Sequence, residues 1–232
     1  MTYANFKDMV AGYLNRSAAS VVTAASVDLI LIAMNDARRM AQRSYDFEML
    51  STQAFVQLSM LPKSLLTDFK TTPAGATTAV VKRVDGLWEY GTQTIAATTV
   101  YYPTKSIEFR RKMALRAHVP SDPNATALTA PTIREFAYVQ GTNIAHTSLT
   151  TQTWVMADVI EFMGDHAGGS VEDIWLVYFT DWLKWATLAN LNVWLKDSER
   201  TVIDANLVAS SWAGVKAFDA RQAHSTDDLS LD

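Results

Sequence analysis

The feature of this sequence that most constrains its fold is an amphipathic helical pattern in residues 26–50. Apolar or small side chains recur there with the spacing i, i+3, i+4, i+7, which places them on one stripe of a helix. Ser26 is expected to cap the helix at its start. Alanines on the stripe leave little volume between two helix axes, so a second helix can approach closely. The stripe consists of Ile30, Ala33, Met34, Ala37, Ala41, Ser44 and Tyr45.

Arginines gather on the opposite side of this predicted helix, toward its end. Arg38, Arg39 and Arg43 are expected to form an exposed basic strip on a rigid element. Two interpretations stay open. The strip is either solvated or paired with acidic groups of a neighbouring subunit.

Three further helical segments are predicted outside residues 51–167. Thr2 is expected to cap the first, with Phe6 and Val10 on its buried stripe. Residues 171–196 are apolar nearly all round, which is typical of a central buried helix. The last helix, residues 199–222, carries its own stripe. Since no stripe can be covered alone, we expect one bundle from residues 1–50 and 168–222, followed by a flexible tail at 223–232. The stripe of the last helix is Ala205, Val208, Ala209, Trp212 and Val215.

Residues 51–167 change to a strand-like pattern and are expected to form an inserted antiparallel β module. The segment from Gln140 to Asn143 is the best candidate for a hairpin turn, and Asp85-Gly86 and Gly91 are expected to lie in turns as well. Two short helices are expected at residues 62–70 and 104–117, and a long loop at 119–132. The predicted fold class is therefore α+β, a helical bundle built from both chain ends with an inserted antiparallel β module.

Composition limits the possible functions. With 49% apolar and 19% charged residues the chain is a folded protein, and its net charge of −4 does not favour general nucleic-acid binding. The absence of cysteine excludes disulfides and thiolate metal sites. The first ten residues lack a signal-peptide pattern, and the longest apolar run, residues 174–179, is too short to cross a bilayer. We expect a soluble protein.

The sequence resembles the head-to-tail adaptor, or connector, proteins of tailed bacteriophages. The resemblance is carried by Asn35-Asp36-Ala37 with the following arginines, by Tyr45-Asp46-Phe47, and by the aromatic helix ending in Leu195-Lys196-Asp197. It covers both chain ends in the same order, while residues 119–132 have no matching pattern. It implies a structural virion protein in the neck between head and tail, assembled in the host bacterial cytoplasm. It further implies a ring of about twelve copies that binds the portal protein, continues the channel for the genomic DNA without sequence-specific binding, and contacts tail or nozzle proteins.

No grouping of residues predicts catalysis, a cofactor or a metal. Asp158, Glu161, Asp165 and His166 are close in sequence, but Asp158 and Glu161 would point to opposite faces of a strand. The remaining histidines, His118, His146 and His224, show no ligand spacing. Gly168-Gly169-Ser170 lacks the lysine of a phosphate loop and is interpreted as a helix cap.

Three other features allow more than one interpretation. The basic segment Lys105, Arg110, Arg111, Lys112 and Arg116 is either a solvated helix face or a contact for DNA phosphates. The tryptophans of residues 171–196 are either core or a ligand pocket, and core is favoured. In the tail, Asp227, Asp228, Leu229 and Leu231 either order on a portal or adaptor neighbour or form a disordered, solubilising end.

Three classes of function follow. The first is the structural ring adaptor. The alternatives are a DNA-packaging regulator, which would be expected to show a basic face, and a tail-associated cell-wall hydrolase, which needs a positioned acid pair. The adaptor accounts for the lack of a catalytic pattern, the two-ended bundle and the polar tail together.

Overall fold

The computed structural model describes residues 1–15, 27–57, 63–73, 75–76, 80–110, 136–140, 143–146, 154–170 and 172–227. The chain is a mixed α+β protein that divides into two compact units. The helical unit combines Met1–Met49 with Gly164–Asp232, and the β unit is Leu50–Met163. The helical unit is therefore discontinuous in sequence.

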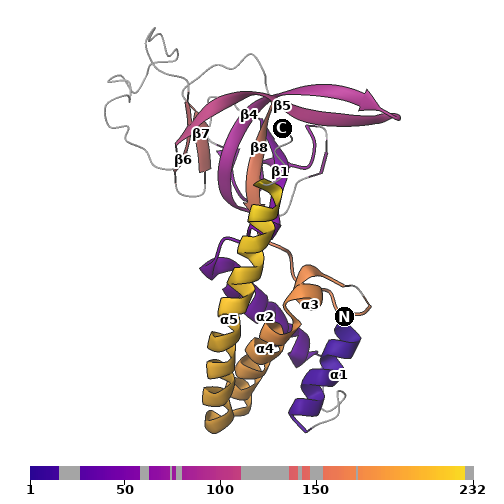
Figure 1. Ribbon diagram of the computed structural model, residues 1–232, viewed down its shortest axis with the longest axis vertical. Coiled ribbons are helices and arrows are strands. Elements are labelled where there is room, and N and C mark those ends of the chain that lie inside the picture. The colour runs from indigo at the N-terminus through magenta and orange to yellow at the C-terminus, as the bar shows by residue number, and fades with distance from the viewer. Residues whose placement is uncertain are drawn as a thin grey trace. The chain divides into compact units, whose positions relative to one another are not determined.

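Helix α4 is the central element of the helical unit, because it contacts each of the other four helices (Figure 1). The helices are α1 (Tyr3–Tyr13), α2 (Leu29–Ser44), α3 (Ile174–Tyr178), α4 (Thr180–Leu195) and α5 (Ser198–Asp227), with a short 3-10 helix η2 (Glu48–Leu50). Among the described residues, none of these helices has the length and apolar character that a bilayer-spanning helix needs.

The predicted apolar stripe of α2 is buried from Ile30 to Ala41. The helix begins two residues later than expected. Asp28 is its N-cap and accepts a hydrogen bond from the Leu31 N–H at 3.2 Å, whereas Ser26 lies outside the described residues. The alanines allow α2 to pack against α4, and the side chain of Asn190 on α4 donates to the Ala33 carbonyl at 3.1 Å. In α1, Thr2 is the N-cap as predicted.

The prediction of a single helix at residues 171–196 is wrong, because the helical structure is interrupted at Phe179 and forms two helices, α3 and α4. Asp173, not Ser170, caps α3 by accepting from the Leu176 N–H at 3.0 Å. The apolar surface is also not buried all round. Trp175 is fully buried, but Trp194 at the other end of α4 is 43% exposed.

Helix α5 extends past Gln222 to Asp227, where a flexible tail from Ala223 was expected. Its packed face also differs from the predicted stripe. Val215, Asp204 and Asp219 are buried, while Ala205 and Ala209 are exposed. The predicted stripe is thus correct at Val215 and, half-buried, at Val208 and Trp212, and wrong at the two alanines. Positions 204 and 219 are polar, so a pattern based on apolar residues alone missed them.

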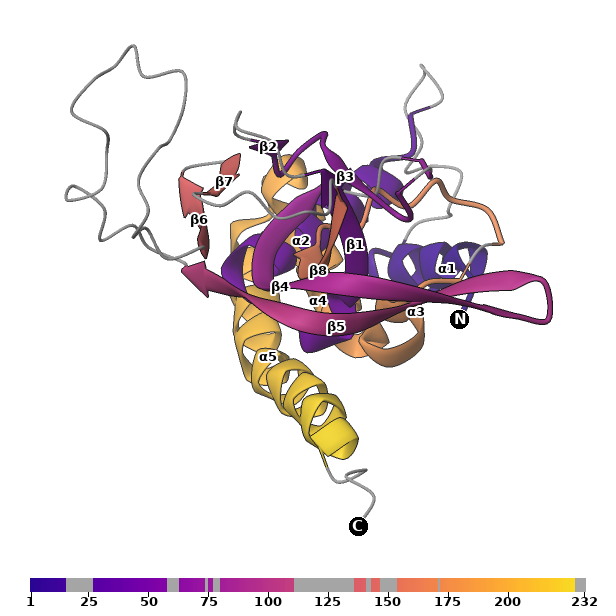
Figure 2. The ribbon, with the colours of Figure 1, turned by 90° about the horizontal axis from the view of Figure 1, so that it is seen from above.

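The β unit is built on an antiparallel sheet with the strand order β3-β1-β8-β4-β5 (Figure 2). Beyond β5, the strand β6 runs parallel to it, and β7 and β2 follow. The buried apolar side chains of this unit form a hydrophobic core that includes Ala54, Leu87 and Val159. The strands are β1 (Ser51–Gln57), β2 (Lys63–Ser64), β3 (Phe69–Lys70), β4 (Val81–Ile95), β5 (Thr98–Arg110), β6 (Phe136–Gln140), β7 (Asn143–His146) and β8 (Trp154–Glu161).

The predictions of two short helices in this unit are both wrong for the residues that the structure describes. Residues 63–70 form β2, a turn and β3, and β5 continues to Arg110. Pairing with β4 holds this part of β5 extended and buries Ile107, which overrides the local helical pattern. Arg111, Lys112 and Arg116 lie outside the described residues.

The turns of the β unit are confirmed in one place and differ in another. The hairpin between β6 and β7 pairs Gln140 with Asn143, as predicted. Gly86 and Gly91, however, lie inside β4, where a Cβ atom would meet the rings of Trp88 and Tyr102 at 2.0 and 2.5 Å. These glycines let aromatic rings lie over the backbone instead of making turns.

Candidate functional site

The predicted basic strip on α2 is divided by the packing, because Arg38 is buried and not exposed. Its Nη2 atom lies 3.0 Å from Asp173 Oδ2, and its guanidinium donates to Asn35 Oδ1 at 2.8 Å and to the Gly164 carbonyl at 3.2 Å. Burial lowers the pKa of Arg38, although the charge of Asp173 opposes this shift. Arg38 therefore has a structural role at the entry to α3.

The other two arginines of the strip are exposed. Arg39 pairs with Asp165 and, at 3.0 Å, with Asp36 of the same chain. The hydrogen bond that Arg39 donates to the carboxylate of Asp165 raises the pKa of Arg39. Arg43 lies exposed in the last turn of α2. Because Arg39 already has acidic partners in its own subunit, Arg43 is the stronger candidate of the two for a contact with a neighbour.

Two buried side chains form hydrogen bonds with the backbone where the chain leaves the helical unit and where it re-enters that unit. Asp219 of α5 accepts from the backbone N–H groups of Glu48 and Met49 at 3.0 and 3.1 Å. The amide of Asn35 brackets the backbone of His166, donating to its carbonyl at 3.1 Å and accepting from its N–H at 2.8 Å. Asn35, part of the motif that carries the family resemblance, thus anchors the returning segment.

A cluster of aromatic rings fills the unit between α2, α4 and α5. The ring of Phe47 lies 5.1 Å from that of Trp175 and 5.9 Å from that of Trp212, both edge to face. Trp182 lies 5.1 Å from Trp212. Trp175 and Trp182 are buried, which agrees with the favoured interpretation for these two, whereas Trp194 is 43% exposed. The Tyr45-Asp46-Phe47 motif extends into this core, because Phe47 is buried as well.

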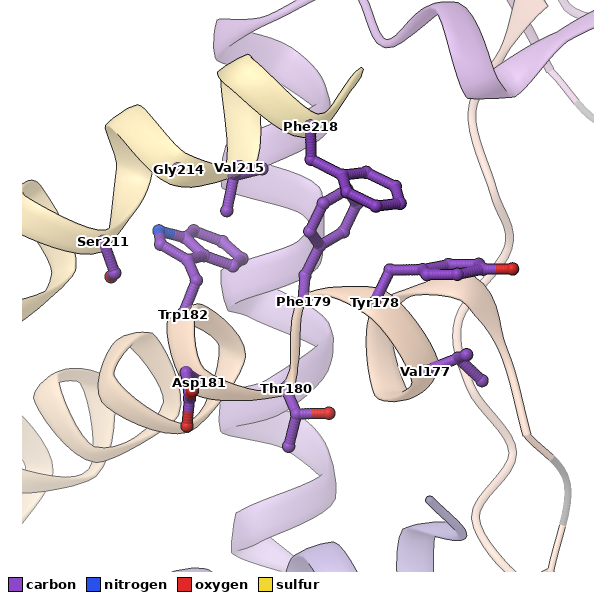
Figure 3. Close-up of a pocket in the computed structure, with 10 residues that line it drawn as sticks. All are labelled: Val177, Tyr178, Phe179, Thr180, Asp181, Trp182, Ser211, Gly214, Val215 and Phe218. Carbon is purple, nitrogen blue, oxygen red and sulfur yellow. The ribbon is translucent and has the colours of Figure 1, made fainter. Parts of the chain in front are cut away.

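The cluster reaches the surface at a hollow of about 370 Å³ between the α3–α4 junction and α5 (Figure 3). The ring of Tyr178 stacks on that of Phe218 with the centroids 5.2 Å apart, and Tyr178 is 56% exposed. The carboxylate of Asp181 is exposed at the rim. This hollow was not predicted, since its lining comes from residues that the sequence places in two separate core helices. The lining residues are Val177, Tyr178, Phe179, Thr180, Asp181, Trp182, Ser211, Gly214, Val215 and Phe218.

A second apolar surface, called the tip here, lies at the opposite end of the α4–α5 hairpin. The chain reverses there at Lys196, which adopts a left-handed conformation. Below the turn, Asn192 donates to Asp204 at 2.6 Å, which joins the two helices. Between this hydrogen bond and the end of the hairpin, large apolar side chains are exposed to solvent. Such a grouping is typical of a protein-interaction surface. The tip consists of Val193, Trp194, Leu195, Val202 and Ile203, each at least 39% exposed.

The β unit presents a ribbon with no charged residue between Glu89 and Lys105. Pairing of β4 with β8 ends at Trp88, and from there to the turn β4 pairs with β5 alone. The ribbon ends in a turn at Ala96 and Ala97, whose φ angles are +47° and +64°. Two-stranded ribbons of this kind are marginally stable alone, so this one is a further candidate contact.

The acidic residues considered for catalysis do not converge. Asp158 and Glu161 lie three positions apart on β8 and thus project to opposite faces. Asp165 pairs with Arg39, and His166 is buried with its Nδ1 accepting from the Gly168 N–H at 2.8 Å. Burial, with a smaller effect of Asp85, raises the pKa of Asp158. In the described part of the chain, no group of three or more metal-ligating side chains occurs.

The remaining predicted contacts are placed only in part. Asp227 ends α5, and its side chain is not described; Asp228, Leu229 and Leu231 lie outside the described residues, as does His118. The side chains of His146, His224 and Arg110 are likewise not described. Lys105 is exposed on β5, with its Nζ 3.6 Å from Glu89.

A scan against models of known protein families matched none, and a search of curated proteins found no relative. The resemblance to phage adaptors accordingly depends on the motifs of this chain.

Proposed function

We propose that this protein is a structural virion protein, a head-to-tail adaptor of a tailed bacteriophage. In this proposal about twelve copies form a ring in the neck of the virion, bind the portal on one side and tail or nozzle proteins on the other, and continue the DNA channel. The helices from both chain ends form the bundle through which copies join, and the β unit is an inserted module. The protein performs no catalysis.

The observation that carries the proposal is the tip of the α4–α5 hairpin. Five large apolar side chains stand in solvent there. Exposed apolar groupings of this kind favour association with other protein surfaces. A ring subunit with neighbours on two sides and partners above and below needs several such surfaces. The tip, the hollow and the uncharged ribbon supply them.

The test is electron microscopy of the purified protein mixed with portal rings from the same phage. The expected result is an added ring of density on one end of the portal, with the rotational symmetry of that ring measurable in projection. A variant with Val202→Asp and Ile203→Asp at the tip should lose the added ring. The matched variant with Ala205→Asp and Ala209→Asp, on exposed α5 positions outside the tip, measures the effect of the added charge alone.

The proposed contact of the tail with the portal has its own test. Because α5 continues to Asp227, a chain ending at Asp227 removes Asp228, Leu229 and Leu231 without shortening the helix. This chain should keep the melting temperature of the full protein and attach less to portal rings. Attachment at full strength would contradict a role for these residues while leaving the ring proposal intact. Portal rings unchanged by the full-length protein would contradict the adaptor function itself.

A further inference from the structure

The hollow and the tip lie at opposite ends of one helical hairpin. The hollow is lined at the first turn of α4 and the tip is formed by its last turn. Helix α4 has 16 residues, so the two ends are separated by about 24 Å along its axis. The two surfaces are different patches, so the tip of a copy can contact one neighbour while its hollow receives the tip of another. Two different patches on one subunit are what a head-to-tail contact uses.

Both surfaces present aromatic side chains. The tip offers Trp194, a large, partly exposed aromatic side chain of the kind that anchors protein interfaces. The hollow is walled by aromatic rings, among them Tyr178 and Phe218, and its volume falls in the range of about 300–1,000 Å³ typical of binding pockets. Figure 3 shows Phe179, Phe218 and Tyr178 grouped at one end of the hollow and Trp182 at the other.

Charged residues of both signs follow the tip residue Leu195, and Asp197 pairs there with Arg200 of the same chain at 3.8 Å. Among them, Lys196 is opposite in sign to the carboxylate at the rim of the hollow. Lys196 follows the tip residue Leu195 directly and is exposed. Asp181 stands at the rim of the hollow with 87% of its side chain in solvent, where it also pairs with Lys184 of the same chain at 3.4 Å. A lysine at the edge of one surface and a carboxylate at the edge of the other favour one orientation of docking.

We propose that the tip of one copy docks in the hollow of the next copy, with Trp194 inserted between the aromatic walls and Lys196 facing Asp181. The occupant of the hollow is thus a second copy of this chain. Each copy gives its tip to one neighbour and its hollow to the other, and repeated contacts of this type close into a ring when the rotation permits. The inference rests on the proposed ring and names the contact that would build it.

Two variants block the two sides of this contact. Trp194→Ala removes the anchor from the tip. Gly214→Leu fills the hollow from α5, where a Cβ atom meets no other heavy atom within 4 Å. Replacing a helical glycine favours the helix, so loss of assembly by this variant cannot be attributed to unfolding. Gly12→Leu on α1, where the Cβ position is equally open, is the matched control.

The variants are compared by sedimentation velocity and native mass spectrometry, with and without portal rings. The intact protein and Gly12→Leu should form the same oligomers. Trp194→Ala and Gly214→Leu should each raise the dissociation constant by roughly 30-fold or more, as loss of an interface anchor does. An equimolar mixture of these two variants still contains one intact tip and one intact hollow per pair. It should therefore form heterodimers and stop there.

The outcomes separate this contact from the wider proposal. Assembly of either variant as strongly as the intact protein, or a mixture without heterodimers, would overturn the docking of tip in hollow, whether or not rings bind the portal. The docking of tip in hollow would also be overturned if the intact protein formed no oligomers, either alone or in the presence of portal rings. Heterodimers in the mixture together with no binding to portal rings would support the contact and refute the adaptor function.

Discussion

The guanidinium of Arg38 lies 3.0 Å from the carboxylate of Asp173, and both side chains are at most 10% exposed. In the described structure, Arg38 Nε and Asp173 Oδ2 have no hydrogen-bond partner, so the contact is an ion pair that is not aligned as a hydrogen bond. The pair joins α2 to the cap of α3. A buried pair of this kind is weak evidence for net stabilisation, but breaking it leaves an uncompensated charge.

Arg38→Ala is therefore expected to lower the free energy of unfolding by about 3–5 kcal/mol. Arg39→Ala, which removes an exposed arginine one position away, should cost no more than about 1 kcal/mol. Urea unfolding followed by tryptophan fluorescence measures both. Equal effects of the two substitutions would mean that the burial of Arg38 has no energetic consequence.

Close packing of α2 against α4 gives a second prediction. Ala37 is 2% exposed and leaves no room for a larger side chain, so Ala37→Leu should overpack the contact and cost about 1–3 kcal/mol. Ala213→Leu places the same side chain on the exposed face of α5 and should leave the melting temperature nearly unchanged. An unchanged melting temperature for Ala37→Leu would show that the core repacks freely there.

Asp28 predicts a specific dependence on pH. Burial works against ionisation of its carboxylate, but the hydrogen bonds from Lys7 Nζ and the Leu31 N–H outweigh it, so its pKa lies below the ordinary value of 3.8. A carboxyl group with a lowered pKa in the folded state stabilises above the unfolded pKa, and this contribution is lost as the pH falls through the folded pKa.

Asp28→Asn keeps a good N-cap but removes the charge that pairs with Lys7 at 2.6 Å. We expect it to lower stability by about 1 kcal/mol at pH 7 and to have progressively less effect as the pH falls below 4. Thermal unfolding between pH 7 and pH 2.5 tests this. The control is Asp8→Asn, which changes an exposed acid on α1. A pH-independent difference between Asp28→Asn and the natural sequence would assign the effect to the cap alone.

The turn of the β4–β5 ribbon predicts a stabilising change. Ala96 and Ala97 both have positive φ, a conformation that suits asparagine and glycine better than alanine. The double substitution Ala96→Asn and Ala97→Gly should stabilise the ribbon by roughly 1–2 kcal/mol, visible as slower amide hydrogen exchange in β4 and β5. Ala96→Val should have the opposite effect, since a β-branched residue is strained at this φ.

The absence of catalysis also remains a prediction. The purified protein is expected not to release soluble fragments from peptidoglycan. Release that Glu161→Gln abolishes would require a new account of the acidic residues on β8.

Elements whose patterns are local follow from the amino-acid sequence alone. The stripe of α2, the Thr2 cap of α1, the hairpin between β6 and β7 and the mixed α+β class could all be predicted, because side-chain periodicity, capping and turn chemistry act within a few residues.

Which polar residues are buried and which apolar residues are exposed depends instead on the tertiary packing. Arg38 and Asp219 are buried because partners distant in sequence, Asp173 and the backbone of Glu48, satisfy them there. Strand pairing held residues 104–110 in β5 against their helical pattern. The hollow arises where the helical structure is interrupted at Phe179 and α5 passes the junction of α3 and α4. Trp194 is exposed in the last turn of α4, before the chain reverses direction at Lys196. These features depend on long-range contacts, and no local pattern encodes them.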